Sequence, residues 1–129
     1  MTTELTILAY AALLQLLQFT LFSIAANLQI GPKRAMGPRD DKIELTGTAG
    51  RLQRALNNHF EGLILFTLAV IVVTLGQQST AFTAGCGWTY LAARVLYVPA
   101  YVFGWRPWRS AIWGVGFFAT LAMIVAALL

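Results

Sequence analysis

The stretch Arg51-Leu52-Gln53-Arg54-Ala55-Leu56-Asn57-Asn58-His59-Phe60-Glu61 decides the fold. It is a polar run in a chain that is 58% hydrophobic, and it continues without a helix breaker into the apolar residues 62–73. We therefore predict a helix that begins polar and ends as a membrane span. At about 100° per residue, four polar side chains share a sector of about 80°, and His59 points away from them. The four are Arg51, Arg54, Asn58 and Glu61.

The composition is that of a membrane protein. Only 11% of the 129 residues are charged, whereas a soluble domain carries about 25%. The length suits four spans of about 20 residues each. The net charge of +4 lies mostly in short connections, which favours membrane orientation over nucleic-acid binding, so no nucleic-acid partner is expected. The single cysteine, Cys86, excludes an internal disulfide and a cysteine-based metal site, and we expect no metal.

The apolar runs predict one domain over residues 1–129, an all-α integral membrane protein built as a four-helix bundle. The expected spans are residues 5–30, 50–75, 80–103 and 110–129, each bound approximate. Gly31-Pro32 is a strong helix stop after the first span. Thr48 is a candidate N-cap for the second helix.

The positive charges predict the orientation of the four spans. Eight of the nine Lys and Arg lie in the first connection, at the start of the second helix, or in the third connection, and Arg94 is the exception. The positive-inside rule places connections one and three in the cytoplasm. Both termini then face outward.

Depth along the helices predicts which buried polar groups meet. Glu61 lies about 15 Å inside the cytoplasmic end of its span, and Arg94 lies at about the same depth in the antiparallel third span. A lone charge at mid-membrane costs from about 3 to over 10 kcal/mol. We therefore predict an intramembrane salt bridge between Glu61 and Arg94.

Tyrosines flank Arg94 on one side of the third span. On the helical wheel, Tyr90, Arg94, Tyr97 and Tyr101 fall within about 60° of one another. With Arg106 and Arg109 at the membrane surface, they predict a cationic, hydroxyl-lined recess. Such a recess suits a small anionic molecule and a hydrophobic co-substrate that arrives from the bilayer. The same arginines also fit a structural role as positive-inside residues, and a buried Glu–Arg pair also fits a role in joining helices.

Arg51-x-x-Arg54-Ala55-x-x-Asn58-x-x-Glu61 resembles the signature of the MAPEG family, the membrane-associated proteins in eicosanoid and glutathione metabolism. Gly37-Pro38-Arg39-Asp40 is similar to bacterial members. Arg94-x-x-Tyr97-x-x-x-Tyr101 and the later Arg109-Ser110 extend the resemblance over nearly the whole chain.

The resemblance implies a homotrimer that binds glutathione as co-substrate at its subunit interfaces, near the cytoplasmic face. Spans one and two of one subunit and spans three and four of its neighbour would supply the groups. The implied glutathione-binding residues are Arg51, Arg54, Asn58, Glu61, Arg94, Tyr97 and Tyr101. Arg109 would lie near the sulfur as the catalytic group, and Arg106 competes for that role.

The resemblance implies a membrane-bound glutathione transferase or glutathione-dependent peroxidase in the bacterial inner membrane. Its substrates would be hydrophobic electrophiles or lipid hydroperoxides, and a guanidinium would stabilise the thiolate. One alternative is a non-catalytic lipid-binding protein, or an accessory subunit, of the same fold. Another is a small proton-coupled exporter, which requires an unpaired carboxylate with few cations around it.

Overall fold

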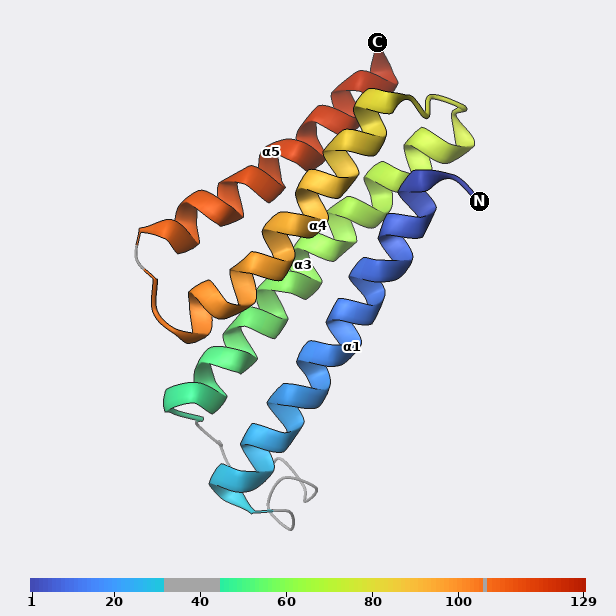
Figure 1. Cartoon of the computed structure of the whole chain (residues 1–129). Coiled ribbons are helices and arrows are strands. Elements are labelled where there is room, and N and C mark those ends of the chain that lie inside the picture. Colours follow the sequence, from blue (N-terminus) through green and yellow to red (C-terminus); the bar gives the residue numbers. More distant parts are fainter. Residues whose placement is uncertain (32–44, 106) are drawn as a thin grey trace.

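The computed structural model describes residues 1–31, 45–105 and 107–129, and these residues form four long helices (Figure 1). The helices are α1 (Thr3–Ile30), α3 (Gly47–Leu75), α4 (Ala81–Val102) and α5 (Trp108–Leu128). Each predicted span falls on one of them, so the predicted all-α bundle is confirmed.

The helices form an antiparallel up-and-down bundle. Both termini and the α3–α4 turn lie at one end, and the end of α1, the start of α3 and the end of α4 lie towards the other (Figure 1). α3 contacts each of the other three helices, whereas α1 and α5 lie on opposite sides of the bundle without contact. α4 also contacts each of the other three. In the first half of α3, His59 is buried inside the bundle, whereas Arg51, Arg54 and Glu61 are exposed.

Three of the helices, α1, α3 and α5, are long and apolar enough to cross a membrane. Many of their large apolar side chains are exposed, as expected for a surface that meets lipid. α4 has 22 residues, about 33 Å at the helical rise, which is long enough to span. Its polar residues Tyr90, Arg94 and Tyr97 are buried inside the bundle. The chain is thus a membrane protein.

The apolar core takes residues from all four helices and lies towards the end that holds the termini. Phe66 stacks on Tyr90, with ring centroids 4.0 Å apart and ring planes 7° from parallel. Gly87 permits a close approach of α4 to α1, because a Cβ at this position would lie 2.8 Å from Ile7 Cδ1. These contacts fix α4 between α1 and α3, and hence the height of its polar residues.

A buried carboxylate ties α1 to α4 at the same end. Glu4 is fully buried and accepts hydrogen bonds from two hydroxyl groups. Ser79 Oγ lies 2.8 Å from each of its carboxylate oxygens, and Thr83 Oγ1 lies 2.6 Å from one of them. A buried charge requires such donors. No pattern in the sequence predicted this cluster.

The amide of Gln29 joins α1 and α3 at the opposite end. Gln29 Nε2 donates to the carbonyl of Thr46 at 2.8 Å, and the backbone N–H of Thr46 donates to Gln29 Oε1 at 3.0 Å. Thr46 is the N-cap of α3, so the predicted N-cap at Thr48 is wrong. The pairing with Gln29 fixes Thr46 in an extended conformation, and the helix begins directly after it.

Candidate functional site

Two arginines of α3 reach the C-terminal end of α4. Arg51 Nη1 donates to the carbonyl of Val102 at 2.9 Å, and Arg54 Nε donates to the hydroxyl of Tyr101 at 3.0 Å. Val102 is the last residue of α4, so its carbonyl has no partner within the helix and carries part of the negative end of the helix dipole. A guanidinium is a favourable partner at this position.

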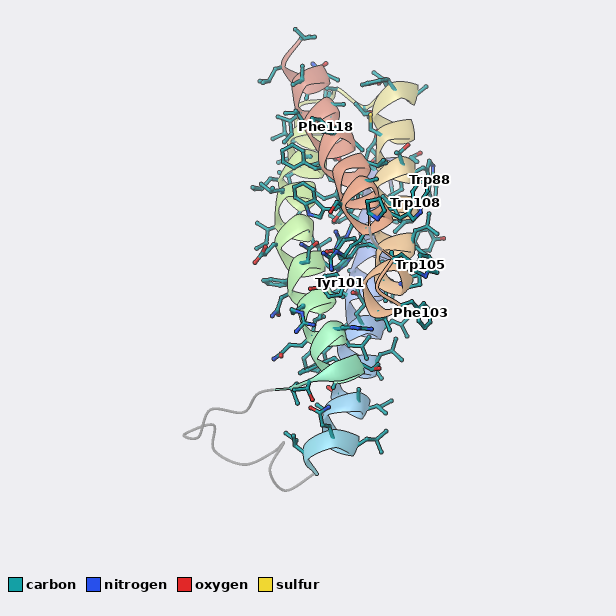
Figure 2. All side chains as sticks on the ribbon, turned by 90° about the vertical axis from the view of Figure 1, so that its left-hand side faces the viewer. Trp88, Tyr101, Phe103, Trp105, Trp108 and Phe118 are labelled. Atoms are coloured by element: carbon teal, nitrogen blue, oxygen red, sulfur yellow. The ribbon has the colours of Figure 1, made fainter. Side chains whose placement is uncertain are left out.

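Tyr101 is the centre of the cationic group. The Cζ of Arg109, on α5, lies 4.8 Å from the centroid of the Tyr101 ring, and the Cζ of Arg54 lies 5.8 Å from it. Both distances suit cation–π contacts. Figure 2 shows Tyr101 near the apolar aromatic residues at the α4–α5 connection, Phe103, Trp105 and Trp108, which are exposed. One phenol ring thus links arginines from α3 and α5.

Arg94 lies deeper in the bundle and is only 3% exposed. Its Nη1 donates to Asn58 Oδ1 at 2.9 Å, and its Cζ lies 4.6 Å from the centroid of the Tyr97 ring. Its Nε and Nη2 are buried and have no hydrogen-bond partner. A charge at this depth costs several kcal/mol, roughly 3 or more, unless it is compensated. Arg94 therefore requires an acceptor that the described part of the chain does not provide.

The predicted Glu61–Arg94 salt bridge is not formed. Arg94 bonds to Asn58, while Glu61 is exposed and lines the same cavity as Arg94. The helical wheel explains the difference, because Asn58 and Glu61 point about 60° apart around α3. The prediction used only the depth of the two residues along their helices. The rotation of α3 about its own axis turns Asn58, and not Glu61, towards Arg94.

Two cavities adjoin these residues. The larger, of about 420 Å³, lies between α3 and α5, with Tyr90 and Arg94 of α4 in its wall. The smaller, of about 150 Å³, is lined by Asn58, Tyr97, Arg109, Ser110 and Trp113. Asn58 and Trp113 line both cavities, so the two spaces are neighbours.

Most of the predicted site residues meet within the single chain. Direct contacts link Arg54, Tyr101 and Arg109, and a second set links Asn58, Arg94 and Tyr97. Arg51 lies beside the first set, and Glu61 shares the large cavity with the second. The family resemblance divided these spans between neighbouring subunits, but α3, α4 and α5 of a single chain already bring the groups together. Arg106 lies outside the described residues.

Trp113 and Ser110 were not predicted as site residues. Both line the small cavity beside Arg109. Trp113 follows Arg109 by four residues and so lies on the same side of α5, a spacing that was available in the sequence.

His59 lies away from the site, on the side of α3 that meets α1. It is fully buried, and its Nδ1 lies 2.6 Å from Gln15 Oε1. Glutamine oxygen is an acceptor, so Nδ1 carries the proton, and Nε2 is left without a partner. The pair joins α1 to α3 and does not contribute to the cavities.

A sequence model of the MAPEG family matches residues 7–129. The match covers all four helices apart from the first turn of α1. No curated protein and no solved structure matches the chain.

Proposed function

The chain belongs to the MAPEG family, and from this premise we propose that it is a membrane-bound glutathione transferase or glutathione-dependent peroxidase. The family includes glutathione transferases and peroxidases. The proposed substrates are hydrophobic electrophiles or lipid hydroperoxides.

The observation that carries the proposal is an excess of cations over carboxylates among the described residues at one end of the bundle. Arg94 lines the large cavity and Arg109 lines the small cavity, while Arg51 and Arg54 bond to Val102 and Tyr101 at the end of α4. Among the described residues, Glu61 is the carboxylate that lines the large cavity. Glutathione carries two carboxylates, one ammonium group and one thiol, so its charges complement this arrangement.

Each group has a proposed role. Arg51 and Arg54 bind glutathione carboxylates, because guanidinium groups bind carboxylates through two parallel hydrogen bonds. Glu61, with Asn58, receives the ammonium group. Arg94, Tyr97 and Tyr101 line the pocket. Arg109 lies near the sulfur and lowers the thiol pKa from about 8.5, which raises the thiolate fraction at neutral pH.

We place the site in a homotrimer at the cytoplasmic side of a bacterial inner membrane, with both termini on the outer side. Two features support this placement. The connections are basic, and the cavities lie at the same end of the bundle as the α4–α5 connection. The large cavity is open between α3 and α5, and a neighbouring subunit that covers this opening would exclude water from the thiolate.

A first experiment measures binding and turnover with purified protein in detergent. Calorimetry with glutathione should show saturable binding. Conjugation of chlorodinitrobenzene or reduction of cumene hydroperoxide should show turnover. Binding without turnover would support the non-catalytic alternative, and absence of both would reject the transferase and peroxidase proposals together.

A second experiment tests the location of the site. Tyr101→Phe removes the hydroxyl that holds Arg54 Nε, and loss of such a bond to a charged group should weaken glutathione binding about tenfold. Tyr10→Phe is the matched control, because Tyr10 is 49% exposed and packs on Trp88, away from the arginines. Equal affinities for both variants would place glutathione elsewhere.

The exporter hypothesis has one observation in its favour, since Glu61 is not paired with Arg94. However, an exporter for cations needs a negative site, and the arginines around Glu61 repel a cation. Proton-driven uptake of a cationic dye into vesicles, lost in Glu61→Gln, would support that hypothesis over ours.

A further inference from the structure

A hydrogen bond joins α3 to α1 near the middle of α3. His59 is fully buried, and its Nδ1 lies 2.6 Å from Oε1 of the half-buried Gln15. Ala55 and Leu56, which are buried on the preceding turn of α3, make apolar contacts. Apolar packing is not directional, whereas a hydrogen bond weakens steeply away from its preferred angle. The Gln15–His59 pair therefore restrains the rotation of this turn of α3 about the helix axis.

The preceding residue on the same turn, Asn58, bonds to a different helix. Its Oδ1 accepts a hydrogen bond from Arg94 Nη1 at 2.9 Å. Successive residues are about 100° apart around a helix, so His59 meets α1 while Asn58 meets α4. One turn of α3 is thus held from two sides, and a rotation that breaks one bond also displaces the other.

The bond from Asn58 decides what Arg94 offers to a ligand. Asn58 takes Nη1 and leaves Nε and Nη2, which are buried and have no partner among the described residues. These two nitrogens lie on one edge of the guanidinium and can bind an anionic group through two parallel hydrogen bonds. A rotation of α3 by about 20° would move a side-chain atom about 5 Å from the helix axis by about 2 Å. Such a shift would break the bond to Asn58 and release the guanidinium.

We propose that His59 and Gln15 are positioning residues of the candidate site, which hold Asn58 against Arg94 and so keep the Nε–Nη2 edge of Arg94 directed towards bound glutathione. Both residues belong to the contact between α1 and α3, and neither lines the two cavities described above. They act on the ligand only through Asn58 and Arg94. This inference rests on the proposed function, because glutathione is the ligand of that function.

Matched leucine substitutions on α1 test the pair. Gln15→Leu removes the acceptor of His59 and should weaken glutathione binding about tenfold in calorimetry. Gln18→Leu is the control, because Gln18 lies one turn further along α1, is 1% exposed, and has an amide without a partner among the described residues. This control should leave the affinity unchanged. Equal losses in both variants would overturn the role of the pair.

Two substitutions of His59 separate the hydrogen bond from the volume of the ring. His59→Asn keeps an N–H donor close to the position of Nδ1, and His59→Phe keeps a ring without a donor. His59→Asn should bind glutathione nearly as well as the wild type, and His59→Phe should bind it about tenfold less tightly. The reverse order would show that packing, and not the bond, is responsible. Gln15 is only half-buried, so Gln15→Leu still tests the bond if His59→Phe does not fold.

A double-mutant cycle tests whether the pair acts through Asn58. In the Asn58→Ala background the contact to be positioned is gone, so Gln15→Leu should cause no further loss of glutathione affinity. A second tenfold loss in that background would show that the pair acts by another route, and it would overturn the inference.

Kinetics distinguish positioning from a loss of folded protein. Gln15→Leu should raise KM for glutathione about tenfold and leave kcat at saturating glutathione unchanged. The reason is that Arg109, the group proposed to lie near the sulfur, belongs to α5. A variant that merely contains less folded protein has a lower apparent kcat at an unchanged KM. That second pattern would contradict the positioning role.

Unfolding of the purified protein by dodecyl sulfate tests the inference without glutathione. In the cycle of Gln15→Leu and Asn58→Ala, the effects on the unfolding equilibrium constant should be non-additive by at least about tenfold, which corresponds to about 1.4 kcal/mol. If this coupling is present but the wild type neither binds nor turns over glutathione, the proposed function is wrong and the positioning of Arg94 stands. If glutathione binds but the coupling is absent, the function stands and this inference is wrong.

Discussion

Replacing Thr83 with valine should destabilise the bundle more than any comparable hydroxyl removal on α4. Thr83 Oγ1 donates to the buried Glu4 carboxylate at 2.6 Å and accepts from the backbone N–H of Thr80 at 2.8 Å. Valine keeps the shape and removes both bonds. The carboxylate then retains Ser79 as donor, but one side of the charge is left without a partner.

The expected loss follows from these two bonds. A hydrogen bond to a charged group contributes about 1.5 to 3 kcal/mol, and loss of a helix cap costs about 1 kcal/mol. We therefore expect Thr83→Val to lower the free energy of unfolding by about 3 kcal/mol. A double-mutant cycle with Glu4→Met isolates the contact, and its coupling energy should be about 1.5 kcal/mol or more.

The assay is unfolding of the purified protein in dodecylmaltoside by added dodecyl sulfate, followed by circular dichroism. Thr89→Val is the control on the same helix, because Thr89 is exposed and its hydroxyl donates to the carbonyl of Gly85 at 2.8 Å, within α4. This control should change the free energy by less than about 0.5 kcal/mol. Similar losses in both variants, or a coupling energy near zero, would show that Thr83 does not hold the carboxylate.

Three further predictions concern the site and the α1–α3 contact. Arg109→Ala should lower turnover more than Arg106→Ala, by at least tenfold in kcat, because Arg109 lines the small cavity; equal or reversed losses would identify Arg106 as the sulfur-activating group. Gln15→Leu should lower the free energy of unfolding by about 1 to 3 kcal/mol in the same assay, because it leaves both ring nitrogens of the buried His59 without partners. A decrease of less than about 0.5 kcal/mol would contradict this expectation. Cys86→Ser should leave glutathione turnover unchanged, since Cys86 lines the groove on the other side of α4, and a large loss would point to a protein thiol in the reaction.

The sequence predicted the helices well because the bilayer leaves few alternatives. Every backbone polar group must be satisfied within lipid, so long apolar runs become helices. Gly31-Pro32 and the turn after Leu75 then divide the chain. The central position of α3 was less evident, although its polar first half already required partners on several sides.

The sequence predicted which polar residues would come together, but not how they pair. The helical wheel placed Arg54, Asn58 and Glu61 on one side of α3, yet it gave no rotation of that helix against α4. That rotation decides whether Asn58 or Glu61 meets Arg94. The contact of Arg54 with Tyr101 depends in addition on side-chain torsions, which a wheel does not contain.

The buried carboxylate at Glu4 had no signal in the sequence. A glutamate in the first turn of a helix is ordinarily an exposed residue that interacts with the helix dipole. Its partners, Ser79 and Thr83, stand far along the chain and are brought near only by the antiparallel bundle. Such a group becomes recognisable only when the helix ends are placed in space.

The amide of Gln29 has a consequence for engineering. It bonds to both the N–H and the carbonyl of Thr46, as a neighbouring strand residue would, so this side chain holds the last turn of α1 and the start of α3 in register. The closure entropy of a connection rises only slowly with length, by about 0.6 kcal/mol for each doubling. Epitope tags or a fused reporter inserted between Gly31 and Leu45 should therefore leave the bundle intact, whereas the same insertion in Gln29→Leu should loosen it.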